Sequence, residues 1–250
     1  METSTVAIVT GASRGLGQAL ALGLMQNGTR LTTVARSHDP RLAERAAAIG
    51  CTLQQVQSDL ANPSAAERVA KQVVAGLPAG AQRYVLINNA GTVHPINQAG
   101  DLDSAAAITA AFSLNVTSVM LITAAFLQAV KPLQADCRII NISSGAGRNP
   151  TAGWGVYCAT KAALDHYTRV IDAENHGVRI VSLAPGVIDT GMQETIRSSA
   201  STDFPNVERF AQLHEQGQLA APGDVADRIL RYLSSDDFGT TVLDDIRNHA

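Results

Sequence analysis

Residues 154–161 read WGVYCATK, in a chain of 250 residues whose aromatic side chains make up only 4% of the total. Tyr157 and Lys161 stand at i and i+4, so on a helix their side chains share one face and can meet. A free tyrosine has a pKa near ~10, and a neighbouring ammonium group lowers that pKa, which makes the phenol a usable proton donor at neutral pH. The same spacing occurs on helices where the two side chains only pack. The pair therefore indicates either proton-transfer chemistry or a packing contact.

Two further polar residues would complete a proton-transfer site. Ser144 follows the strand expected over 138–142, where a hydroxyl can donate to a substrate carbonyl as negative charge builds on its oxygen. Asn115 lies in an otherwise apolar helical stretch, and asparagine is a poor helix former. We expect its amide to distort the helix and to hold a water beside Lys161. The predicted catalytic residues are Asn115, Ser144, Tyr157 and Lys161.

Three glycines in TGASRGLG, residues 10–17, separate an expected strand from an expected helix. Gly11, Gly15 and Gly17 would let the backbone turn and approach a pyrophosphate at the helix N-terminus, where the helix dipole favours an anion. Their spacing differs from the G-x-G-x-x-G dinucleotide pattern, and a turn that only needs positive φ would also use glycine. The context favours a phosphate-binding loop.

Two arginines indicate whether the cofactor is NAD or NADP. Arg36 follows the second expected strand, where a carboxylate would bind the ribose 2′-hydroxyl of NAD and an arginine accommodates the 2′-phosphate of NADP. Arg14 could close on the same phosphate, and Ser37 could add a hydroxyl donor. Asp59, after the third strand, is suited to accept from the adenine amino group, although aspartate is also common in exposed turns. NADPH or NADP+ is therefore the predicted cofactor, with two solvated surface arginines as the alternative.

The elements that must position these residues alternate along the chain. Short β-branched runs are separated by longer Ala-rich stretches, which is typical of strand–helix–strand units and a parallel sheet. The expected strands are 5–9, 30–34, 52–56, 84–88, 138–142, 178–183 and 240–243. The expected helices are 15–27, 40–49, 63–76, 103–112 continuing through 115–130, 155–175, 191–198 and 222–234. The sequence predicts a single doubly wound, Rossmann-type α/β domain over 1–250, with a seven-stranded, mainly parallel sheet and helices on both faces.

The unusual residues fall where such a sheet binds its ligand. The carboxyl ends of the strands form a crevice where the strand order reverses. TGASRGLG follows the first expected strand, NNAG (88–91) the fourth, SSGAG (143–147) the fifth and APGVIDT (184–190) the sixth. The region 190–221 departs from the alternation, because it is polar and punctuated by proline. We expect it to form a substrate lid.

Composition argues against several other classes of protein. Hydrophobic residues make up 46%, charged residues 16% and the net charge is −3, so we expect no attraction to nucleic acid or to a membrane surface. Cys51, Cys137 and Cys158 are scattered and no histidine has metal-ligand spacing, so we expect neither disulfides nor a metal site, and a cytoplasmic location. The N-terminus lacks the features of a signal peptide, and the apolar run 116–130 is shorter than a bilayer span.

These residues together resemble the short-chain dehydrogenases/reductases that carry a Tyr-x-x-x-Lys pair. The matching motifs run in that family's order from residue 5 to about 195, namely TGASRGLG, NNAG, Asn115, NISS, YCATK and APGVIDT. The resemblance implies that a hydride passes between nicotinamide C4 and the substrate carbon, while Ser144 orients the carbonyl and Tyr157 supplies the proton. It also implies that Lys161 lowers the pKa of Tyr157, binds ribose hydroxyls and connects the site to solvent through a water near Asn115.

The same resemblance, with the glycine loop and the arginines, gives the expected cofactor contacts. They are Gly11, Ser13, Arg14, Gly15, Leu16, Gly17, Arg36, Ser37, Asp59, Leu60, Asn88, Asn89, Ala90, Gly91, Tyr157, Lys161, Pro185, Gly186, Ile188 and Thr190.

A narrower resemblance, outside that shared core, is to sepiapterin reductase and the related bacterial benzil reductases. It is carried by GWGVYC (153–158), DTGMQ (189–193) and SSDDFGTTVLDD (234–245). Sepiapterin reductases more usually have an acidic residue where Gly191 stands, and they anchor the pterin through an aspartate near the C-terminus. Asp245 is the nearest counterpart here and Asp244 is the alternative, although both could be solvated tail residues.

The expected substrate pocket suits a bulky conjugated ketone or a vicinal diketone. Trp154 would form an aromatic wall beneath a lid that includes Ile196 and Phe204, although each of these side chains could belong to the core instead. The expected substrate residues are Ser144, Trp154, Tyr157, Met192, Gln193 and Asp245.

We carry three hypotheses for function. The first is an NADPH-dependent carbonyl reductase, the second is a 3-oxoacyl reductase or another short-chain alcohol dehydrogenase, and the third is a non-catalytic protein that senses NADP(H). The complete proton-transfer set argues against the sensor. The long Ala-rich helices over 103–130 and 155–175 would let two subunits pack a four-helix interface, so we expect a homodimer, with a tetramer as the alternative.

Overall fold

A seven-stranded parallel sheet in the order β3-β2-β1-β4-β5-β6-β7 forms the centre of the structure, a computed structural model that describes residues 4–249. Neighbouring strands pair in parallel throughout the described residues. The strands are β1 (Thr5–Thr10), β2 (Thr29–Ala35), β3 (Thr52–Gln57), β4 (Arg83–Asn88), β5 (Asp136–Ile142), β6 (Arg179–Ala184) and β7 (Leu243–Asp245). The predicted doubly wound α/β fold is confirmed.

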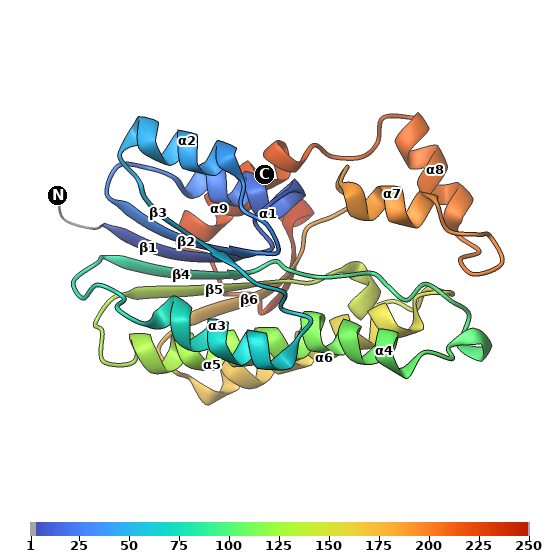
Figure 1. Cartoon of the computed structure of the whole chain (residues 1–250), viewed down its shortest axis with the longest axis horizontal. Helices are drawn as coiled ribbons and strands as arrows, with labels where there is room; N and C mark the ends of the chain where they lie inside the picture. Colours follow the sequence, from blue (N-terminus) through green and yellow to red (C-terminus); the bar gives the residue numbers. More distant parts are fainter. Residues whose placement is uncertain (1–3, 250) are drawn as a thin grey trace.

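Helices cover both faces of the sheet, as Figure 1 shows. α1, α2 and α9 lie on one face, α3 to α6 lie on the other, and α7 and α8 project past the carboxyl ends of the strands. The helices are α1 (Gly15–Leu24), α2 (Pro40–Ile49), α3 (Pro63–Val74), α4 (Ala105–Phe112), α5 (Ser118–Val130), α6 (Gly155–Glu174), α7 (Gly191–Arg197), α8 (Val207–Glu215) and α9 (Pro222–Ser234).

Burial of both sheet faces explains the sequence of the central strands. Parallel strands covered by helices on both sides carry continuous apolar runs rather than alternating ones, and YVLI at 84–87 in β4 is fully buried. On one face Leu20 of α1 and Ile229 of α9 pack against the sheet, and on the other Val69 of α3 and Phe126 of α5 do so. Each buried side chain of this size stabilises the fold by roughly 1.5–3 kcal/mol.

Helix starts are specified locally by capping residues. α2 and α3 each begin with a proline, and the preceding Asp39 and Asn62 accept backbone hydrogen bonds from the first turn. α1 differs, because its N-cap residue Arg14 makes no side-chain capping hydrogen bond. The N–H groups that open α1 are therefore left for another partner.

One long helical run crosses the sheet face opposite α1. Ala105–Val130 comprises α4, a π-helical turn at Ser113–Thr117 and α5. By length and composition alone its 26 residues could cross a membrane, and half of its most apolar window is buried. The expected helical stretch over 103–112 and 115–130 is confirmed, whereas the expectation of a segment too short for a bilayer considered only its apolar run 116–130. Ile122 and Phe126 pack in the core, as expected for a buried helix.

Two elements differ from the sequence expectation. β7 lies at Leu243–Asp245 instead of 240–243, because Leu243 is the residue aligned with Ser182 of β6. The expected lid contains a second helix, α8, beyond the expected helix near 191–198. Phe210 on one face of α8 packs beside Trp154 and Phe204, and this apolar contact holds a mostly polar helix in place.

Candidate active site

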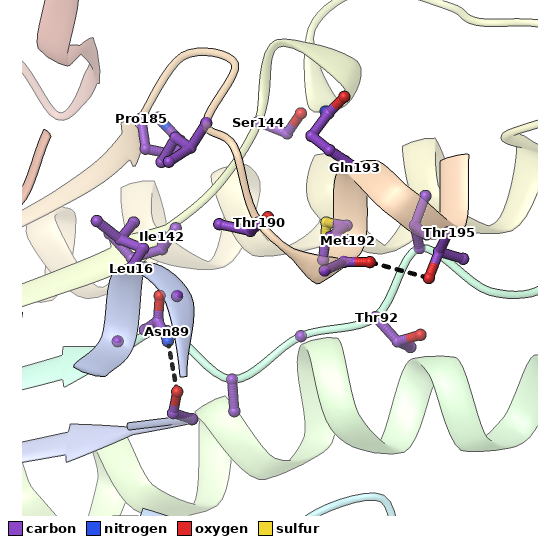
Figure 2. A pocket seen from close by; sticks show the side chains of 18 of the residues that line it. Leu16, Asn89, Thr92, Ile142, Ser144, Pro185, Thr190, Met192, Gln193 and Thr195 are labelled. Atoms are coloured by element: carbon purple, nitrogen blue, oxygen red, sulfur yellow. Dashed lines mark hydrogen bonds between the residues drawn. The ribbon is translucent and has the colours of Figure 1, made fainter. Parts of the chain in front are cut away.

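A cavity of about 1380 Å³ opens at the carboxyl ends of the strands. It is lined by the loops that follow β1 to β6, by α7, and by Asp245 and Arg247 near the C-terminus. Figure 2 shows Leu16 of α1, Asn89 of the loop after β4, and Thr190 and Met192 around this cavity. Pockets for one small molecule usually measure about 300–1,000 Å³, so this cavity can hold a large cofactor and a substrate together.

The glycine loop packs directly against the loop after β4. Gly11 and Gly15 have positive φ angles of 69° and 57°. A Cβ on Gly11 would lie 2.8 Å from Ala90 Cα, and one on Gly17 would collide with Asn89 Nδ2 and the Gly11 carbonyl oxygen. Asn89 Nδ2 donates to the carbonyl oxygens of Thr10 and Gly11 at 3.0 and 3.2 Å, and Figure 2 draws one of these two bonds. The loop therefore needs glycine, and its shape leaves the α1 N-terminus facing the cavity.

These residues fit a dinucleotide. The uncapped α1 N-terminus offers backbone donors to an anion, and Arg14 and Arg36 both line the cavity as exposed cations. The Arg14 guanidinium extends toward the lid, because a Cβ on Gly191 would lie 3.6 Å from Arg14 Nη1. Asp59 lines the cavity and also accepts a hydrogen bond from the Ala61 N–H at 3.0 Å, as a turn aspartate does.

Two of the predicted cofactor residues lie outside the cavity. Ser37 is exposed beyond the cavity rim. Asn88 is 2% exposed, and its Nδ2 donates to Thr123 Oγ1 at 3.1 Å and to Asn141 Oδ1 at 2.9 Å. It is the last residue of β4, so its side chain points into the layer between the sheet and α5, and the next residue, Asn89, faces the cavity. The other predicted cofactor residues all line the cavity.

Tyr157 and Lys161 lie on one face of α6 and both line the cavity. They are 7% and 5% exposed, so little more than their functional ends can reach a ligand. Lys161 Nζ donates to the Ile142 carbonyl oxygen at 2.8 Å and lies 5.8 Å from the centroid of the Tyr157 ring. Ser144, in the turn after β5, also lines the cavity, and its hydroxyl is near enough to act on the pKa of Tyr157. The structure thus brings together three of the four predicted catalytic residues.

Burial dominates the acid–base properties of this pair. It raises the pKa of Tyr157 to about 12, against which the nearby Ser144 hydroxyl acts. Burial also lowers the pKa of Lys161 to about 8, against which the nearby Asp165 acts. Lys161 is not among the groups that shift the pKa of Tyr157 here, and its Nζ donates to the Ile142 carbonyl oxygen, so the lowering of the Tyr157 pKa by Lys161 stays a prediction.

Asn115 supports the site from behind and does not line the cavity. It lies in the π-helical turn, which is the expected distortion of the helix. Its Oδ1 accepts from the Thr92 N–H at 2.8 Å, and its Nδ2 donates to the Thr92 carbonyl oxygen at 2.8 Å and to Thr160 Oγ1 at 3.0 Å. The side-chain amide thus anchors the loop after β4, and the expected water beside Lys161 stays a prediction.

Sequence reasoning missed two partners of Asn115. Thr92 follows the NNAG motif directly, and Thr160 lies next to Lys161 inside the helix motif. Each is a short polar residue beside a recognised motif, which is the only signal the sequence offered. Thr92 and Thr160 are brought together by the side chain of Asn115, which lies on another element. Spacing along the sequence does not reveal a contact of this kind.

The lid residues divide into wall and core. Trp154, Met192, Gln193 and Ile196 line the cavity, whereas the fully buried Phe204 does not. Phe204 stacks on Trp154 with ring centroids 4.8 Å apart and an interplanar angle of 12°. Of the two interpretations of Phe204, lid or core, the structure supports the core, because this ring packs behind Trp154.

The side chain of Trp154 lines the cavity and also belongs to a buried hydrophobic cluster. Its ring also meets Tyr157 edge-on at 5.5 Å, and its indole Nε1 is buried with no hydrogen-bond partner among residues 4–249. The Oε1 of Gln193 has no partner there either. The wall of the cavity therefore holds one buried donor and one buried acceptor that the described residues leave unsatisfied.

Of the two C-terminal aspartates, Asp245 faces the cavity and Asp244 does not. Asp245 forms an ion pair with Arg247, whose Nη2 and Nε lie 2.6 and 2.8 Å from its carboxylate oxygens. Asp244 is 5% exposed and bonds inward to Tyr232 and His249. The charge of Asp245 is thus already balanced by Arg247, a cavity residue that sequence reasoning missed.

The chemistry available in the cavity is proton transfer next to a dinucleotide site. No cluster of three metal-ligating side chains occurs within residues 4–249. A family model described as short chain dehydrogenase matches residues 5–201. The chain belongs to the short-chain dehydrogenase family. The motif resemblance seen in the sequence is confirmed.

The relatives of this short-chain dehydrogenase include two kinds of reductase. It is 36% identical over 236 residues to a benzil reductase ((S)-benzoin forming) of Bacillus cereus, covering 92% of this chain and 94% of that protein. It is 35% identical over 243 residues to the sepiapterin reductase of Meriones unguiculatus, covering 93% and 92%. These matches place the chain among oxidoreductases that act on CH–OH and C=O groups.

A solved structure supports the same fold. A protein from Beutenbergia cavernae, described as an NAD(P)-dependent gluconate 5-dehydrogenase with NADP bound at low occupancy, superposes with a TM-score of 0.79 at 25% identity. The superposition covers 98% of this chain and 95% of that one. This short-chain dehydrogenase therefore uses a nicotinamide cofactor, as its family does.

Proposed function

We propose that this short-chain dehydrogenase is an NADPH-dependent carbonyl reductase whose substrate is a vicinal diketone or a pterin side-chain carbonyl. The observation that carries the proposal is that Ser144 and Tyr157 both line the cavity, beside the Trp154 wall. Two hydroxyls beside an aromatic wall suit a carbonyl attached to a flat conjugated group.

The geometry supports a proton-coupled reduction. NADPH, when bound, supplies the hydride that the carbonyl carbon accepts. The Ser144 hydroxyl donates a hydrogen bond to the carbonyl oxygen and orients it, and Tyr157 gives its proton to that oxygen as the alcohol forms. Lys161 stabilises the resulting phenolate until solvent returns the proton. Burial of the tyrosine keeps competing water away from this transfer.

Two findings support NADPH over NADH. Arg36 lies in the cavity at the end of β2, where an acidic residue would suit the ribose 2′-hydroxyl of NAD. The Beutenbergia cavernae structure carries NADP. Arg14 adds a second cation to the same cavity, so an extra phosphate would be favoured here.

The substrate class rests on the relatives and on the wall of the cavity. The Bacillus cereus relative is a benzil reductase that forms (S)-benzoin, and the Meriones unguiculatus relative is a sepiapterin reductase. Met192 of the lid and Trp154 supply the flat, apolar surface that a phenyl or pterin ring would contact. A diketone needs no further anchor, whereas a pterin would need Asp245 to leave Arg247.

A substrate panel tests the proposal. Purified protein is mixed with NADPH or NADH and with benzil, isatin, sepiapterin or a 3-oxoacyl thioester, and loss of the NADPH absorbance is followed. We expect turnover with benzil or sepiapterin, and a higher kcat/KM with NADPH. Fast reduction of the thioester alone would replace the proposal with the 3-oxoacyl reductase. NADPH binding without turnover on any carbonyl would favour the sensor.

We also propose that the protein works as a cytoplasmic homodimer. Phe112, Met120 and Val170 are exposed large apolar side chains on α4, α5 and α6, the helices expected to form a four-helix interface. The three cysteines are free, which suits a reducing compartment. Light scattering after gel filtration tests the oligomeric state, and Met120→Glu should shift a dimer toward monomer.

A further inference from the structure

Asp165 lies one helical turn beyond Lys161 on the face of α6 that carries Tyr157. It is 5% exposed, and its carboxylate accepts three hydrogen bonds from other elements. Ser143 Oγ and Ser182 Oγ donate at 2.6 Å each, and Arg148 Nε donates at 3.2 Å. A buried carboxylate with this many partners is a fixed negative charge beside the proton-transfer pair.

Arg148 extends this group to the C-terminal strand. Its Nη1 donates to the Asp244 carbonyl oxygen at 3.0 Å, and its Nη2 donates to the Ser182 carbonyl oxygen at 3.1 Å. One guanidinium thus joins the turn after β5 to α6, β6 and β7. Arginine suits this position, because its planar fork bonds to several acceptors at fixed angles.

The turn that carries Ser144 is therefore held on both sides. Ser143, which directly precedes Ser144, donates to Asp165. Arg148, which follows Ser144 in the same turn, also donates to Asp165. Between them Gly147 passes so close to α6 that a Cβ there would lie 2.9 Å from the Lys161 carbonyl carbon and 3.1 Å from Asp165 Oδ2. The position of the Ser144 hydroxyl relative to Tyr157 depends on this contact.

The charge of Asp165 also acts on Lys161. Burial lowers the pKa of Lys161 to about 8, and Asp165 is the charge that acts in the opposite direction. The other titratable group facing the ammonium from α6 is Tyr157. Arg148, from the turn after β5, already pairs with Asp165, and Asn115, from the π-helical turn, is neutral. Without Asp165, Lys161 would be a buried cation with no carboxylate beside it.

We propose that Asp165, held by Arg148, is a positioning residue of the active site that fixes the Ser144 turn against α6 and keeps the positive charge on Lys161. The kinetic part of this inference rests on the proposed reductase activity. The electrostatic part concerns the protein alone and is measurable without any substrate.

The electrostatic part is tested by NMR of the lysine side chains. The chain has only three lysines, Lys71, Lys131 and Lys161, and the first two are exposed. Lysine labelled at the ε carbon therefore gives three signals, and Lys161→Arg assigns the buried one. In Asp165→Asn we expect Lys161 to titrate at lower pH than in the wild type. An unchanged Lys161 titration would overturn the proposal.

The kinetic part is tested with the same variant. Misplacement of catalytic groups can cost on the order of 10²-fold in rate, so we expect kcat of Asp165→Asn to fall about 10- to 100-fold. As pH rises, the activity of Asp165→Asn should fall at a lower pH than the activity of the wild type, because Lys161 loses its charge at a lower pH in the variant. Asp172 is an exposed aspartate later on α6, so Asp172→Asn serves as the matched control. This variant should leave kcat, the pH dependence of activity and the Lys161 titration unchanged.

Arg148→Met distinguishes the effect of Asp165 on the charge of Lys161 from its effect on the position of the Ser144 turn. This variant is used in place of Asp165→Asn if Asp165→Asn does not fold. It removes a cation near Lys161 while the carboxylate stays, so the Lys161 titration should not move to lower pH, although kcat should still fall. Equal downward shifts in both variants would contradict the assignment of roles. If the wild type reduces no carbonyl, the proposed function fails, but the NMR result still decides the electrostatic part.

Discussion

At the scale of single residues, the proposed mechanism makes Tyr157 an acid although its surroundings oppose ionisation. Burial raises the pKa of Tyr157 to about 12, and among the described residues the Ser144 hydroxyl acts in the other direction. The phenol therefore keeps its proton over the whole physiological range. In the proposed reaction it gives up that proton when the carbonyl oxygen becomes basic during reduction.

Replacing Tyr157 by phenylalanine removes that proton and keeps the ring. We expect kcat for benzil reduction to fall about 10²- to 10⁴-fold, the usual contribution of a positioned general acid. NADPH binding, followed by nucleotide fluorescence, should be retained, because the glycine loop and the arginines are unchanged. Tyr167→Phe, on the same helix but outside the cavity, is the control. Wild-type turnover by Tyr157→Phe would refute the catalytic assignment.

Arg36 should determine which nicotinamide cofactor is used. A hydrogen bond to a charged group contributes about 1.5–3 kcal/mol, which corresponds to roughly 10- to 100-fold in affinity. We expect Arg36→Ala to raise KM for NADPH by that factor and to leave KM for NADH nearly unchanged, as measured by steady-state kinetics. Arg45→Ala, an exposed arginine on α2 outside the cavity, should change neither value. A uniform loss for both cofactors would show that Arg36 does not bind the extra phosphate.

The sequence predicted the residues whose chemistry depends on local spacing. Ser144, Tyr157 and Lys161 are signalled by a strand end and a helical i,i+4 pair, and the structure brings all three to one cavity. Asp165 escaped notice, because an acidic residue one turn after a lysine is usually a solvated ion pair. Only the fold shows that three elements converge on it.

At the scale of elements, the predicted lid consists of α7 and α8, which pack on a cluster of aromatic side chains. Trp154, Phe204 and Phe210 form one packed group, and Ile196 of α7 joins it. The sequence predicted α7 but not α8, since the apolar positions of α8 are few and its polar face resembles a loop. Strands and core helices were predictable because the buried runs are long, whereas the lid depends on contacts between distant rings.

Trp154→Ala tests how far the lid depends on that cluster. Truncating a buried tryptophan usually costs about 3–5 kcal/mol, and we expect a loss of that order in the free energy of unfolding, measured with urea. KM for benzil should rise more than KM for a small ketone such as butane-2,3-dione, because the flat wall is lost. Trp154→Phe keeps an aromatic ring and should lose less of both. Reduced stability with unchanged substrate preference would assign Trp154 to the core alone.

At the scale of the whole molecule, an ionic cluster at the amino ends of the strands holds the sheet together opposite the active site. Asp136 of β5 accepts from Arg83 of β4, Arg138 of β5 and Arg179 of β6. Arg138 is 2% exposed and also donates to the carbonyl oxygens of Leu233 and Ser235 at the end of α9. One carboxylate therefore balances a buried cation and links three strands.

Acid should weaken this cluster in a defined range. Burial alone would raise the pKa of Asp136, but hydrogen bonds from the three arginines outweigh it and hold the pKa at about 2, against an ordinary value of 3.8. The contribution of Asp136 to stability is complete above the ordinary value and is lost as pH falls through about 2. Carboxylate protonation therefore weakens the cluster only in strong acid.

Asp136→Asn should lower the free energy of unfolding at pH 7 by about 1–3 kcal/mol, because Arg138 would be left buried without a counter-charge. Urea unfolding at several pH values measures this loss, and the difference from the wild type should shrink as the pH approaches 2. Glu67→Gln breaks an exposed pair with Lys71 and should cost less than about 0.5 kcal/mol. A loss that stays constant down to pH 2 would contradict the charge-based explanation.

The π-helical turn at Ser113–Thr117 gives the run from α4 to α5 one residue more than a regular helix of the same length would need. Because each residue of an α-helix advances by about 100°, deleting a single residue from this turn would let a regular helix re-form with its two halves in almost the same register. Asn115 would then rotate away from Thr92 and Thr160. A one-codon deletion, rather than a substitution, is thus the smallest genetic change that would disconnect the loop after β4 from α6 while leaving both helices intact.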